Sequence, residues 1–405
     1  MRRSLVLLMM AAAALLIVAP LASTAHAQDS AIQVVPASSI SHPGDAGVRA
    51  HTNIINNIDP NFPAGNCCGA TWETPASLAC VYQLVKPISG CPIATSKTVP
   101  SGGVGAIALV DAYDNPNAVQ DMNTYVNQWG LPAPTFSVVF ANGQRPANDP
   151  GGWSEEEALD IEMAAAAAPK AKIFLVEAAT NSFSDLYQAE SVASNLVASN
   201  GGGFVSNSWS GGEYSGELND EKTYFSTPKV IYFASTGDAG LNNIGVPAVF
   251  ANVVAVGGTT ILRSAGNYQS QSWWFGGGGG LSQFEPRPAY QNVIQGIVGS
   301  KRGIPDVSSD ANPGTGPATF DADGGLNWFQ VGGTSVSSPY MAGVISGAGN
   351  LGPNTKAGLT LLYKEYANPN QYKAYWTDIT AGGSSCKVGW DICTGVGVPL
   401  TFKGK

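Results

Sequence analysis

Short apolar runs alternate with helix-like stretches along the chain, and this alternation constrains the fold more than any other feature of the sequence. The runs are rich in Val and Ile and span residues 104–110, 171–178, 202–209, 229–236 and 252–258. Helix-like stretches separate several of them, at residues 117–130 and 185–199. Buried strands that alternate with helices predict an α/β fold with a mostly parallel central sheet and helices on both faces. Functional groups in such a sheet gather at the carboxyl ends of its strands.

The N-terminus has the pattern of a secretory signal peptide. Two arginines precede an apolar run, Leu5–Ala19, and the small-residue site Ala25-His26-Ala27 follows it. We therefore expect residues 1–27 to be removed and the mature protein to be secreted or periplasmic, without stable membrane association. A single membrane anchor is the alternative, because the apolar run is nearly long enough to span a bilayer. Pro20 and the cleavage-like tail favour the signal peptide.

The chain that follows the predicted signal divides by composition. Residues 28–66 are rich in Pro, Ser, Asn and Gly and lack helical periodicity, which predicts a short leader or loosely ordered extension. Residues 67–405 are then expected to form the main folded domain. Six cysteines in an exported chain predict three disulfides. We expect Cys386 to pair with Cys393, whereas the other four leave three connectivities open: Cys67, Cys68, Cys80 and Cys91.

Charge excludes one class of partner. Only 12% of the residues are charged, and the loss of Arg2 and Arg3 with the signal lowers the net charge from -9 to about -11. Nucleic acid is not expected as a partner, because phosphate binding requires clustered Lys and Arg. The carboxylates of so acidic a chain protonate at low pH, which lowers its net charge and its self-repulsion. This composition is therefore compatible with an acidic environment.

The stretch GGTSVSSPYMAG, residues 332–343, places a serine directly after a glycine-rich turn. Gly332 and Gly333 allow a sharp approach of the backbone, and the following residues can begin a helix with Pro339 in its first turn. Ser335 is therefore a candidate nucleophile. A glycine-rich loop capped by a serine is the structural alternative.

No histidine is an obvious candidate for the base that would activate this serine. Histidine is the usual proton acceptor, but all three histidines precede the first predicted strand. His26 belongs to the predicted signal, and His42 and His51 to the predicted extension. We therefore expect a carboxylate base. The alternative, a subtilisin-like site with Asp111 and a histidine, requires His42 or His51 to reach Ser335.

The sequence GGWSEEEALDIEMAAAAAP carries the best candidates for that base. Ser154 and Glu157 fit a capping box, which predicts a helix that starts at Ser154 and ends at Pro169. Glu156 and Asp160 are about one turn apart on one helix face, where like charges favour a shared proton. A solvated acidic helix start is the alternative, but the Ala and Met run that follows is too apolar for an exposed helix.

A third carboxylate, Asp238, follows the apolar run 229–236 in the motif STGDAG. A turn aspartate is the ordinary interpretation. A protonated aspartic acid in this place can instead donate a hydrogen bond to a developing oxyanion, which requires acidic conditions or a raised pKa.

These motifs together resemble the sedolisin family of serine-carboxyl peptidases, which look like subtilisins with a glutamate in place of the histidine. The family's motifs occur in the family's order between about residues 74 and 399, as EEALDIE, STGDAG, VVAVGGTTI, GGGGLSQFEPRPAYQ, RGIPDVSSDANP and GGTSVSSP. The resemblance implies a subtilisin-like fold, with residues 67–405 as the catalytic domain. It also implies a monomer that cleaves proteins or peptides internally at acidic pH through an acyl-enzyme.

The resemblance also assigns roles to the candidate residues. It implies that Ser335 is the nucleophile, Glu156 the general base and Asp160 the partner that orients Glu156. Asp238 and the backbone N–H of Ser335 would form the oxyanion hole. Residues 202–212 and the loop around 277–280 look like the edges of the substrate cleft, where an extended peptide would bind by strand addition.

One structural calcium ion is a further implication of the resemblance. Asp378, Asp391 and the carbonyls of Ile379 and Gly389 match the family's ligand pattern, and oxygen ligands of this kind suit Ca²⁺. The spacing between the two aspartates is shorter than is usual for the family, and Cys386 and Cys393 bracket Asp391, so a disulfide is the alternative to the metal.

The short N-terminal segment differs from the family pattern and leaves a non-enzymatic function open. The family commonly carries a large folded prodomain, and residues 28–66 are too few to form one. A catalytically inert secreted relative that acts as a binding or interaction protein is therefore the alternative. The presence of all four chemical residues favours the enzyme.

Overall fold

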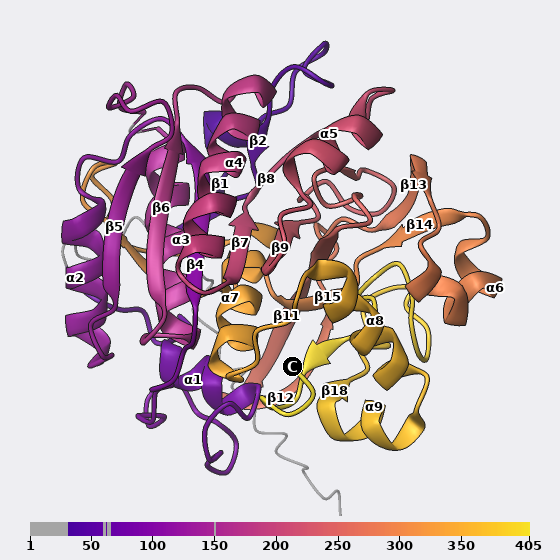
Figure 1. Cartoon of the computed structure of the whole chain (residues 1–405). Helices are drawn as coiled ribbons and strands as arrows, with labels where there is room; N and C mark the ends of the chain where they lie inside the picture. The colour runs from indigo at the N-terminus through magenta and orange to yellow at the C-terminus, as the bar shows by residue number, and fades with distance from the viewer. Residues whose placement is uncertain (1–30, 60–61, 63–65, 150) are drawn as a thin grey trace, which may run out of the picture.

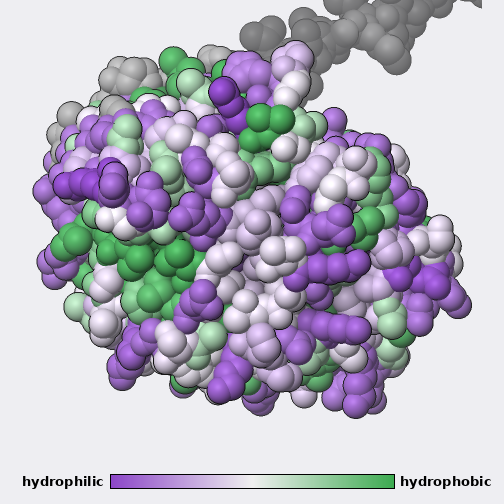
Figure 2. All heavy atoms as spheres, turned by 45° about the horizontal axis from the view of Figure 1, so that its top comes forward, coloured by the Kyte–Doolittle hydropathy of each residue, from purple (hydrophilic) through white to green (hydrophobic). Residues whose placement is uncertain are grey.

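The computed structural model describes residues 31–59, 62, 66–149 and 151–405 (Figure 1). The predicted signal peptide, residues 1–27, and the apolar run of the alternative membrane anchor lie outside these described residues. Within the described part of the chain, no helix is long and apolar enough to cross a membrane. The face turned forward in Figure 2 is mostly hydrophilic, with its largest hydrophobic area on the left and smaller hydrophobic groups elsewhere.

The central sheet is mostly parallel, as the alternating apolar runs predict. Its strands are β4 (Ala106–Ala112), β5 (Thr135–Phe140), β6 (Lys172–Ala178), β7 (Gly203–Asn207), β9 (Val230–Ser235), β11 (Val253–Ser264), β12 (Asn267–Trp273) and β15 (Val307–Asp310). Their order is β12-β11-β9-β7-β4-β6-β5, and β15 also pairs with β11. The pair β11–β12 is antiparallel and the other pairs are parallel. The α/β prediction is therefore confirmed.

Helices cover both faces of this sheet (Figure 1). They are α1 (Pro75–Val81), α2 (Ala118–Trp129), α3 (Trp153–Ala167), α4 (Phe183–Ser199), α5 (Glu217–Tyr224), α6 (Gln295–Val298), α7 (Thr334–Gly347), α8 (Thr355–Tyr366) and α9 (Pro369–Tyr375). Side chains of β4 alternate between two cores: Ile107 and Leu109 share one with α3 and α7, whereas Ala108 and Val110 share the other with α4. This period-two alternation holds the helix layers on opposite sides of the sheet.

Smaller strands and 3₁₀ turns complete the described chain. They are β1 (Ile32–Val34), η1 (Ala37–Ser39), β2 (His51–Thr52), β3 (Ile55–Ile58), β8 (Trp209–Gly212), β10 (Gly245–Val246), β13 (Gly280–Pro286), η2 (Ala289–Ile294), β14 (Lys301–Ile304), β16 (Ala318–Asp321), β17 (Asn327–Gly332), β18 (Trp376–Thr377) and β19 (Val398–Pro399). One small sheet has the order β1-β3-β17-β16, and another has the order β10-β8-β2.

The N-terminal strands contradict the loose extension expected for residues 28–66. Strand β3 pairs with β17, and β2 pairs with β8, so strands far away in sequence hold the described part of this stretch. Asn53 and Ile54, between β2 and β3, are buried. The composition of this segment gave no sign of the pairing, because the partners that bury it lie more than 150 residues further along the chain.

Helix α3 begins at Trp153, with Gly152 as its N-cap, and ends at Ala167. Its extent is close to the prediction, but the capping box is wrong: the N-cap makes no side-chain hydrogen bond, and Glu157 is buried instead. The local sequence matched the capping pattern, whereas packing of the helix between α7 and the sheet decided where its acidic side chains point. The alternative of a solvated acidic face is therefore wrong as well.

Helix α7 begins at Thr334, so Pro339 lies in its second turn and not, as predicted, in its first. Proline has no N–H, and the carbonyl of Ser335 four residues earlier therefore lacks its intrahelical donor. The Oγ of Ser208 lies 3.4 Å from that carbonyl. The proline thus leaves room for a contact between α7 and the segment after β7.

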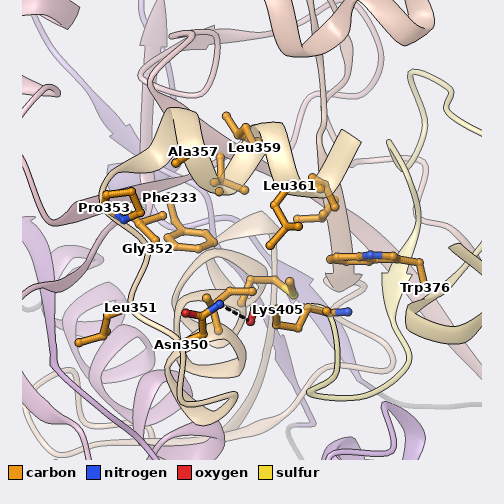
Figure 3. Close-up of a pocket in the computed structure, with 18 residues that line it drawn as sticks. Phe233, Asn350, Leu351, Gly352, Pro353, Ala357, Leu359, Leu361, Trp376 and Lys405 are labelled. Carbon is orange, nitrogen blue, oxygen red and sulfur yellow. Dashed lines mark hydrogen bonds between the residues drawn. The ribbon is translucent and has the colours of Figure 1, made fainter. Parts of the chain in front are cut away.

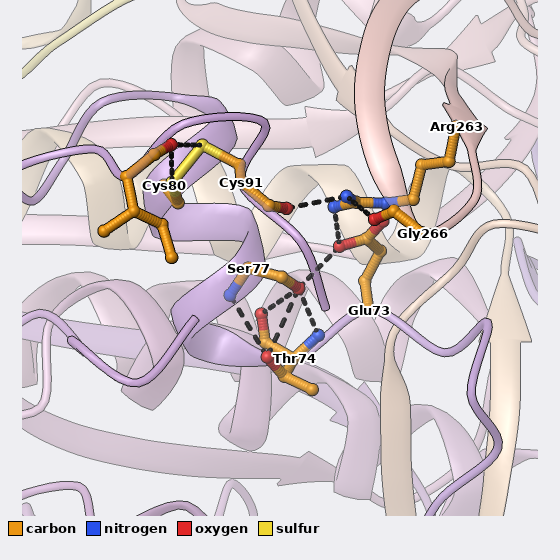
Figure 4. Close-up of a disulfide and its surroundings, with 8 residues drawn as sticks. Glu73, Thr74, Ser77, Cys80, Cys91, Arg263 and Gly266 are labelled. Atoms are coloured by element: carbon orange, nitrogen blue, oxygen red, sulfur yellow. Dashed lines mark hydrogen bonds and ion pairs between the residues drawn. A yellow bond between two sulfur atoms is a disulfide. The ribbon is translucent and has the colours of Figure 1, made fainter. Parts of the chain in front are cut away.

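Disulfides join the cysteines in sequence-adjacent pairs. The predicted bond Cys386–Cys393 is confirmed, and the open connectivity becomes Cys67–Cys68 and Cys80–Cys91. Figure 4 shows the bond Cys80–Cys91 beside a buried ion pair between Glu73 and Arg263. Arg263 also donates to the carbonyl of Cys91 at 2.7 Å. The ion pair and the disulfide together tie the region around α1 to the far end of β11.

Candidate active site

The structure brings the four chemical residues predicted from the sequence into one region at the carboxyl ends of the central strands. Helix α7 supplies Ser335, helix α3 supplies Glu156 and Asp160, and the turn after β9 supplies Asp238. Ser335, Glu156 and Asp160 have no exposed surface.

Ser335 is held by both its backbone and its side chain. Its hydroxyl donates to the carbonyl of Ser208 at 3.0 Å. Its backbone N–H donates to the carbonyl of Asn53 at 3.2 Å. The hydroxyl of Ser208 in turn donates to Asp160 Oδ1 at 2.7 Å. Ser208 therefore connects the candidate nucleophile with the acidic residues of α3.

The carboxyl groups of Glu156 and Asp160 share one buried environment. Burial raises the pKa of Glu156 well above its usual value, and the charges of Asp160 and Asp111 raise it further, while the nearby Ser335 side chain opposes the rise. Both carboxyl oxygens of Glu156 are buried without a hydrogen-bond partner in the described structure. Burial and the charge of Asp111 likewise raise the pKa of Asp160, and the hydrogen bond from Ser208 and the neighbouring Glu156 carboxyl oppose this rise. These two groups therefore favour holding a proton between them.

Asp111 at the end of β4 belongs to the same cluster. Its side chain is fully buried, and neither carboxyl oxygen has a hydrogen-bond partner among the described residues. Burial raises its pKa to about 8. An isolated buried carboxylate is costly, so this group is expected to be protonated at acidic pH.

Asp238 is anchored by the residue before the serine. Its Oδ1 accepts hydrogen bonds from the backbone N–H of Thr334 at 2.8 Å and from the Thr334 hydroxyl at 2.9 Å. Its Oδ2 is buried without a hydrogen bond in the described structure. Burial raises the pKa of Asp238 to about 7, and the bonds from Thr334 oppose this rise. At acidic pH the free oxygen can therefore carry a proton and act as a donor.

Gly333 shows how closely Asp238 and Asn53 approach each other. A side-chain carbon at Gly333 would collide with the carbonyl oxygen of Asn53 and would lie 2.6 Å from Asp238 Oδ2. The backbone there has φ of +108°, which favours glycine. The Asn53 carbonyl and Asp238 Oδ2 therefore lie on the same side of Gly333, and that carbonyl accepts the N–H of Ser335.

Sequence reasoning missed two residues of this region. Ser208 follows strand β7 in the sequence SNSWS, and a serine at the end of a buried strand is the signal that could have identified it. Asn53 lies in the segment that was expected to be loose, and its local sequence carries no comparable signal.

The described contacts of Ser335 involve no histidine. His51 lies in β2, where it pairs with Ser210 of β8 and its Nδ1 lies 3.1 Å from the carbonyl of Thr52. Burial lowers the pKa of His51. Among the acidic groups of α3, Glu156 is the one whose pKa the Ser335 side chain affects.

The candidate calcium ligands lie together near the C-terminus. Asp378 Oδ2 accepts from the backbone N–H of Gly389 at 2.7 Å, while Asp378 Oδ1 is buried with no hydrogen-bond partner in the described chain. Asp391 Oδ1 accepts from the N–H groups of Cys393 and Thr394 at 3.0 and 2.9 Å. The charge of Asp378 is among the causes that raise the pKa of Asp391, after burial. Two neighbouring carboxylates with one unbonded oxygen fit a hard cation.

A separate apolar cavity of about 240 Å³ lies away from these residues (Figure 3). Helix α8, the segment before it and the C-terminal Lys405 contribute to its walls, together with side chains such as Phe233 and Trp376. None of the four chemical residues lines it. The acidic cluster, and not this cavity, is therefore the candidate active site.

The fold is a layered α/β structure in which a buried serine starts a helix that packs on the central sheet. This arrangement defines a subtilisin-like protein. No model of a known protein family matches the chain. Kumamolisin of Bacillus sp. (strain MN-32) is 29% identical over 397 residues, which cover 88% of this chain and 67% of kumamolisin. Sedolisin of Pseudomonas sp. (strain 101) is 26% identical over 376 residues, which cover 81% of this chain and 60% of sedolisin.

Comparison with a solved structure also supports the subtilisin-like fold. Pseudomonas sedolisin, a serine-carboxyl proteinase complexed with two molecules of pseudo-iodotyrostatin, superposes with a TM-score of 0.68 at 22% identity. The superposition covers 82% of this chain and 96% of that structure. The chain therefore has a subtilisin-like fold and is similar to members of the sedolisin family, and these relatives support a peptidase of the serine type. The chain spans less than two thirds of the length of the sedolisin relative.

Proposed function

We propose that the protein is a secreted serine-carboxyl endopeptidase that hydrolyses peptide bonds of proteins at acidic pH. One observation carries the proposal: a buried serine hydroxyl lies among three carboxyl groups, Glu156, Asp160 and Asp238, and its described contacts include no histidine. The peptidase relatives support protein or peptide substrates.

The reaction proceeds through an acyl-enzyme. The hydroxyl of Ser335 attacks the carbonyl carbon of the substrate, and Glu156 accepts its proton while Asp160 retains the proton that the pair shares. Glu156 then donates the accepted proton to the leaving amine. Water enters by the reverse of these proton transfers and releases the acyl group as a carboxylic acid.

The oxyanion is stabilised by two donors. The backbone N–H of Ser335 and a protonated Asp238 donate to the oxygen that becomes negative during the attack. A donor with a pKa of about 7 holds its proton in acidic solution and loses it above neutrality. The mechanism therefore predicts activity in acid and a decline as the pH rises past about 7.

Two accompanying properties belong to the same proposal. The signal-like N-terminus and the disulfides support a location outside the cytoplasm. One structural Ca²⁺ is held by Asp378, Asp391 and the carbonyls of Ile379 and Gly389. Chelation with EDTA should then lower the unfolding temperature, and Asp378→Asn should remove the effect of EDTA.

A peptide library tests the proposed activity. Purified secreted protein is incubated with the library in buffers from pH 3 to pH 8, and the cut sites are identified by mass spectrometry. Ser335→Ala is the matched control and should lose at least about 10⁴-fold in kcat while its circular dichroism is unchanged. An optimum at neutral pH would favour a histidine base, and no cleavage at any pH would favour an inert binding protein.

A further inference from the structure

Ser208 lies where strand β7 meets the candidate active site. Strand β7 pairs with β4 on one side and with β9 on the other, in the middle of the central sheet (Figure 1). Ser208 is the first residue after this strand and has no exposed surface. The proposed reaction gives this serine no role, although it contacts both the candidate nucleophile and the acidic pair of α3.

The alternation of side chains along β7 turns Ser208 toward helices α3 and α7. Trp209, the next residue, belongs to the core on the opposite side of the sheet and donates through Nε1 to the carbonyl of Val110 at 3.0 Å. Ser206, two residues before Ser208, faces α7, where its Oγ lies 2.8 Å from Ser338 Oγ. Residues two apart on a strand share a face. The strand therefore presents the Ser208 hydroxyl to the side on which the acidic pair lies.

The hydroxyl of Ser208 bonds to one oxygen of that pair. It donates to Asp160 Oδ1 at 2.7 Å. Asp160 Oδ2 and both carboxyl oxygens of Glu156 are buried without a hydrogen-bond partner in the described structure. A hydrogen bond to a carboxylate stabilises its ionised form. Ser208 therefore favours the state in which the pair has lost a proton.

The other groups around the pair oppose that state. Burial raises the pKa of both Glu156 and Asp160 well above their usual values. The charge of Asp111 raises both further, the charge of Asp238 acts in the same direction on Glu156, and no cation is among the groups that shift either pKa. A base that works in acid must nevertheless be ionised there. The pair therefore needs a donor that favours its ionised form, and Ser208 is placed to be that donor.

The backbone of Ser208 makes a separate contact with Ser335. Its carbonyl accepts the Ser335 hydroxyl at 3.0 Å. Its Oγ also lies 3.4 Å from the Ser335 carbonyl, which is long for a hydrogen bond. Replacement of Ser208 by alanine keeps its carbonyl and removes its hydroxyl. The contact with Asp160 can thus be tested while Ser335 keeps its acceptor.

We propose that Ser208 is a positioning residue whose hydroxyl holds the Glu156–Asp160 pair in its singly ionised form in acid and thereby sets the acidic limit of activity. The proposal rests on the proposed peptidase function. Ser208 transfers no proton itself and acts through Asp160. Without its hydroxyl the pair keeps both protons to a higher pH, and Glu156 cannot accept the proton of Ser335 until the pair has lost one.

The pH profile of kcat/KM tests this role. The parent protein and Ser208→Ala are compared over the acidic and neutral range, with a peptide that the library identifies as a substrate. Ser208→Ala should move the acidic limb to higher pH by about one to two units, which is the strength of a hydrogen bond to a charged group. The decline near pH 7 that the proposed mechanism assigns to Asp238 should stay in place, and KM should change less than about twofold. A merely structural loss would instead lower activity at every pH.

Ser206→Ala is the matched control. Ser206 lies on β7, is equally buried and has its hydroxyl beside that of Ser338, where β7 packs against α7. Its pH profile should match that of the parent. Ser208→Thr keeps a hydroxyl and should keep the acidic limb of the parent. Equal shifts in Ser206→Ala and Ser208→Ala would overturn the inference, because packing between β7 and α7 would then explain both.

A titration without turnover covers the case of a variant that is too slow for kinetics. The infrared band of protonated carboxyl groups is followed in Ser335→Ala and in Ser335→Ala/Ser208→Ala, and part of it should disappear at higher pH in the double variant. Coinciding acidic limbs of Ser208→Ala and the parent, or coinciding infrared titrations, overturn this inference and leave the peptidase function standing. A parent protein that cleaves no library peptide at any pH overturns the proposed function and this inference with it.

Discussion

Two regions of the molecule bury carboxylates in opposite ways. Arg302 and Asp306, both without exposed surface, form a bidentate ion pair with contacts of 2.9 and 2.6 Å. The Ala255 N–H and the Tyr363 hydroxyl also donate to Asp306, at 2.9 and 2.8 Å. The candidate active-site cluster of Asp111, Glu156 and Asp160 has no cation among the groups that shift the pKa of its members. The charge of Asp111 raises the pKa of both Glu156 and Asp160. A carboxylate with a cation beside it has its charge balanced inside the fold, whereas the unpaired cluster has no such partner and is expected to bind protons.

This difference indicates what each region does. The Arg302 pair satisfies its charges internally, so it is a fixed part of the core. The cluster stays costly whenever it is fully ionised, and a bound proton relieves that cost. Groups that hold a proton only loosely between neighbours are suited to accept one from a hydroxyl and to return it to an amine.

Replacement of Glu156 should give the largest effect, because it should lower activity strongly without lowering stability. Glu156→Gln removes the proton acceptor, and kcat should fall by about 10²- to 10⁴-fold. The unfolding temperature should stay the same or rise, because the change removes a buried group that repels Asp160 and Asp111. Steady-state kinetics and calorimetry measure the two effects.

Glu157→Gln is the matched control for that change. Glu157 is the next residue of α3 and is equally buried, but the charges that raise its pKa after burial are those of Glu177, Asp111 and Asp114. It should retain most of the activity. Full activity in Glu156→Gln together with an inactive Glu157→Gln would move the role of base to Glu157.

Breaking the ion pair should give the opposite result. Asp306→Asn leaves the Arg302 guanidinium buried without its countercharge, and the free energy of unfolding should fall by about 3–5 kcal/mol. Urea denaturation measures the loss. The kcat of the remaining folded protein should change little, because Asp306 makes no recorded contact with the four chemical residues.

A double replacement controls for the loss of packing in the single variant. Arg302→Met/Asp306→Leu removes both charges at once and should be more stable than Asp306→Asn. A double variant as unstable as the single one would show that packing around these side chains, and not the unpaired charge, explains the loss.

Asp238 shares one property with each region. Like Asp306 it accepts hydrogen bonds, here from neutral donors of Thr334, and like the unpaired cluster it has a raised pKa, of about 7. Asp238→Ala removes an oxyanion donor and should lower kcat by about 10²- to 10³-fold. Asp238→Asn keeps a donor that does not titrate, so it should lose less and extend activity above pH 7. Identical pH profiles of Asp238→Asn and the parent enzyme would exclude Asp238 as the titrating donor.

The sequence predicted the layers of the fold and the four chemical residues, because both depend on local patterns. Runs of Val and Ile marked β4, β6, β7, β9 and β11, and the ordered motifs marked Ser335, Glu156, Asp160 and Asp238. The structure places these four residues together, and their roles stay predictions.

Contacts between distant segments could not be predicted in the same way. The pairing of Asn53 with the hydroxyls of Ser210 and Ser235 joins residues 157 and 182 positions apart. Glu157 fitted a capping box by its spacing from Ser154, but tertiary burial overrode that local preference. A local pattern reports what a segment can do alone, and these residues are placed by what packs against them.

The last expected effect is a pH dependence of stability to which Asp111 of the unpaired cluster contributes. Burial raises the pKa of Asp111 to about 8 in the folded protein, whereas an aspartate of the unfolded chain titrates near 3.9. Between these two values the folded state binds more protons than the unfolded state. The free energy of unfolding should therefore be greatest near pH 4 and should fall as the pH rises toward 8, by at most about 1.4 kcal/mol per pH unit for this group. Urea midpoints of Ser335→Ala, which cannot digest itself, measure the slope, and Ser335→Ala/Asp111→Asn should flatten it. His51, whose pKa is lowered by burial, acts in the opposite direction but is present in both variants, so an unchanged slope would show that Asp111 is not protonated in the folded state.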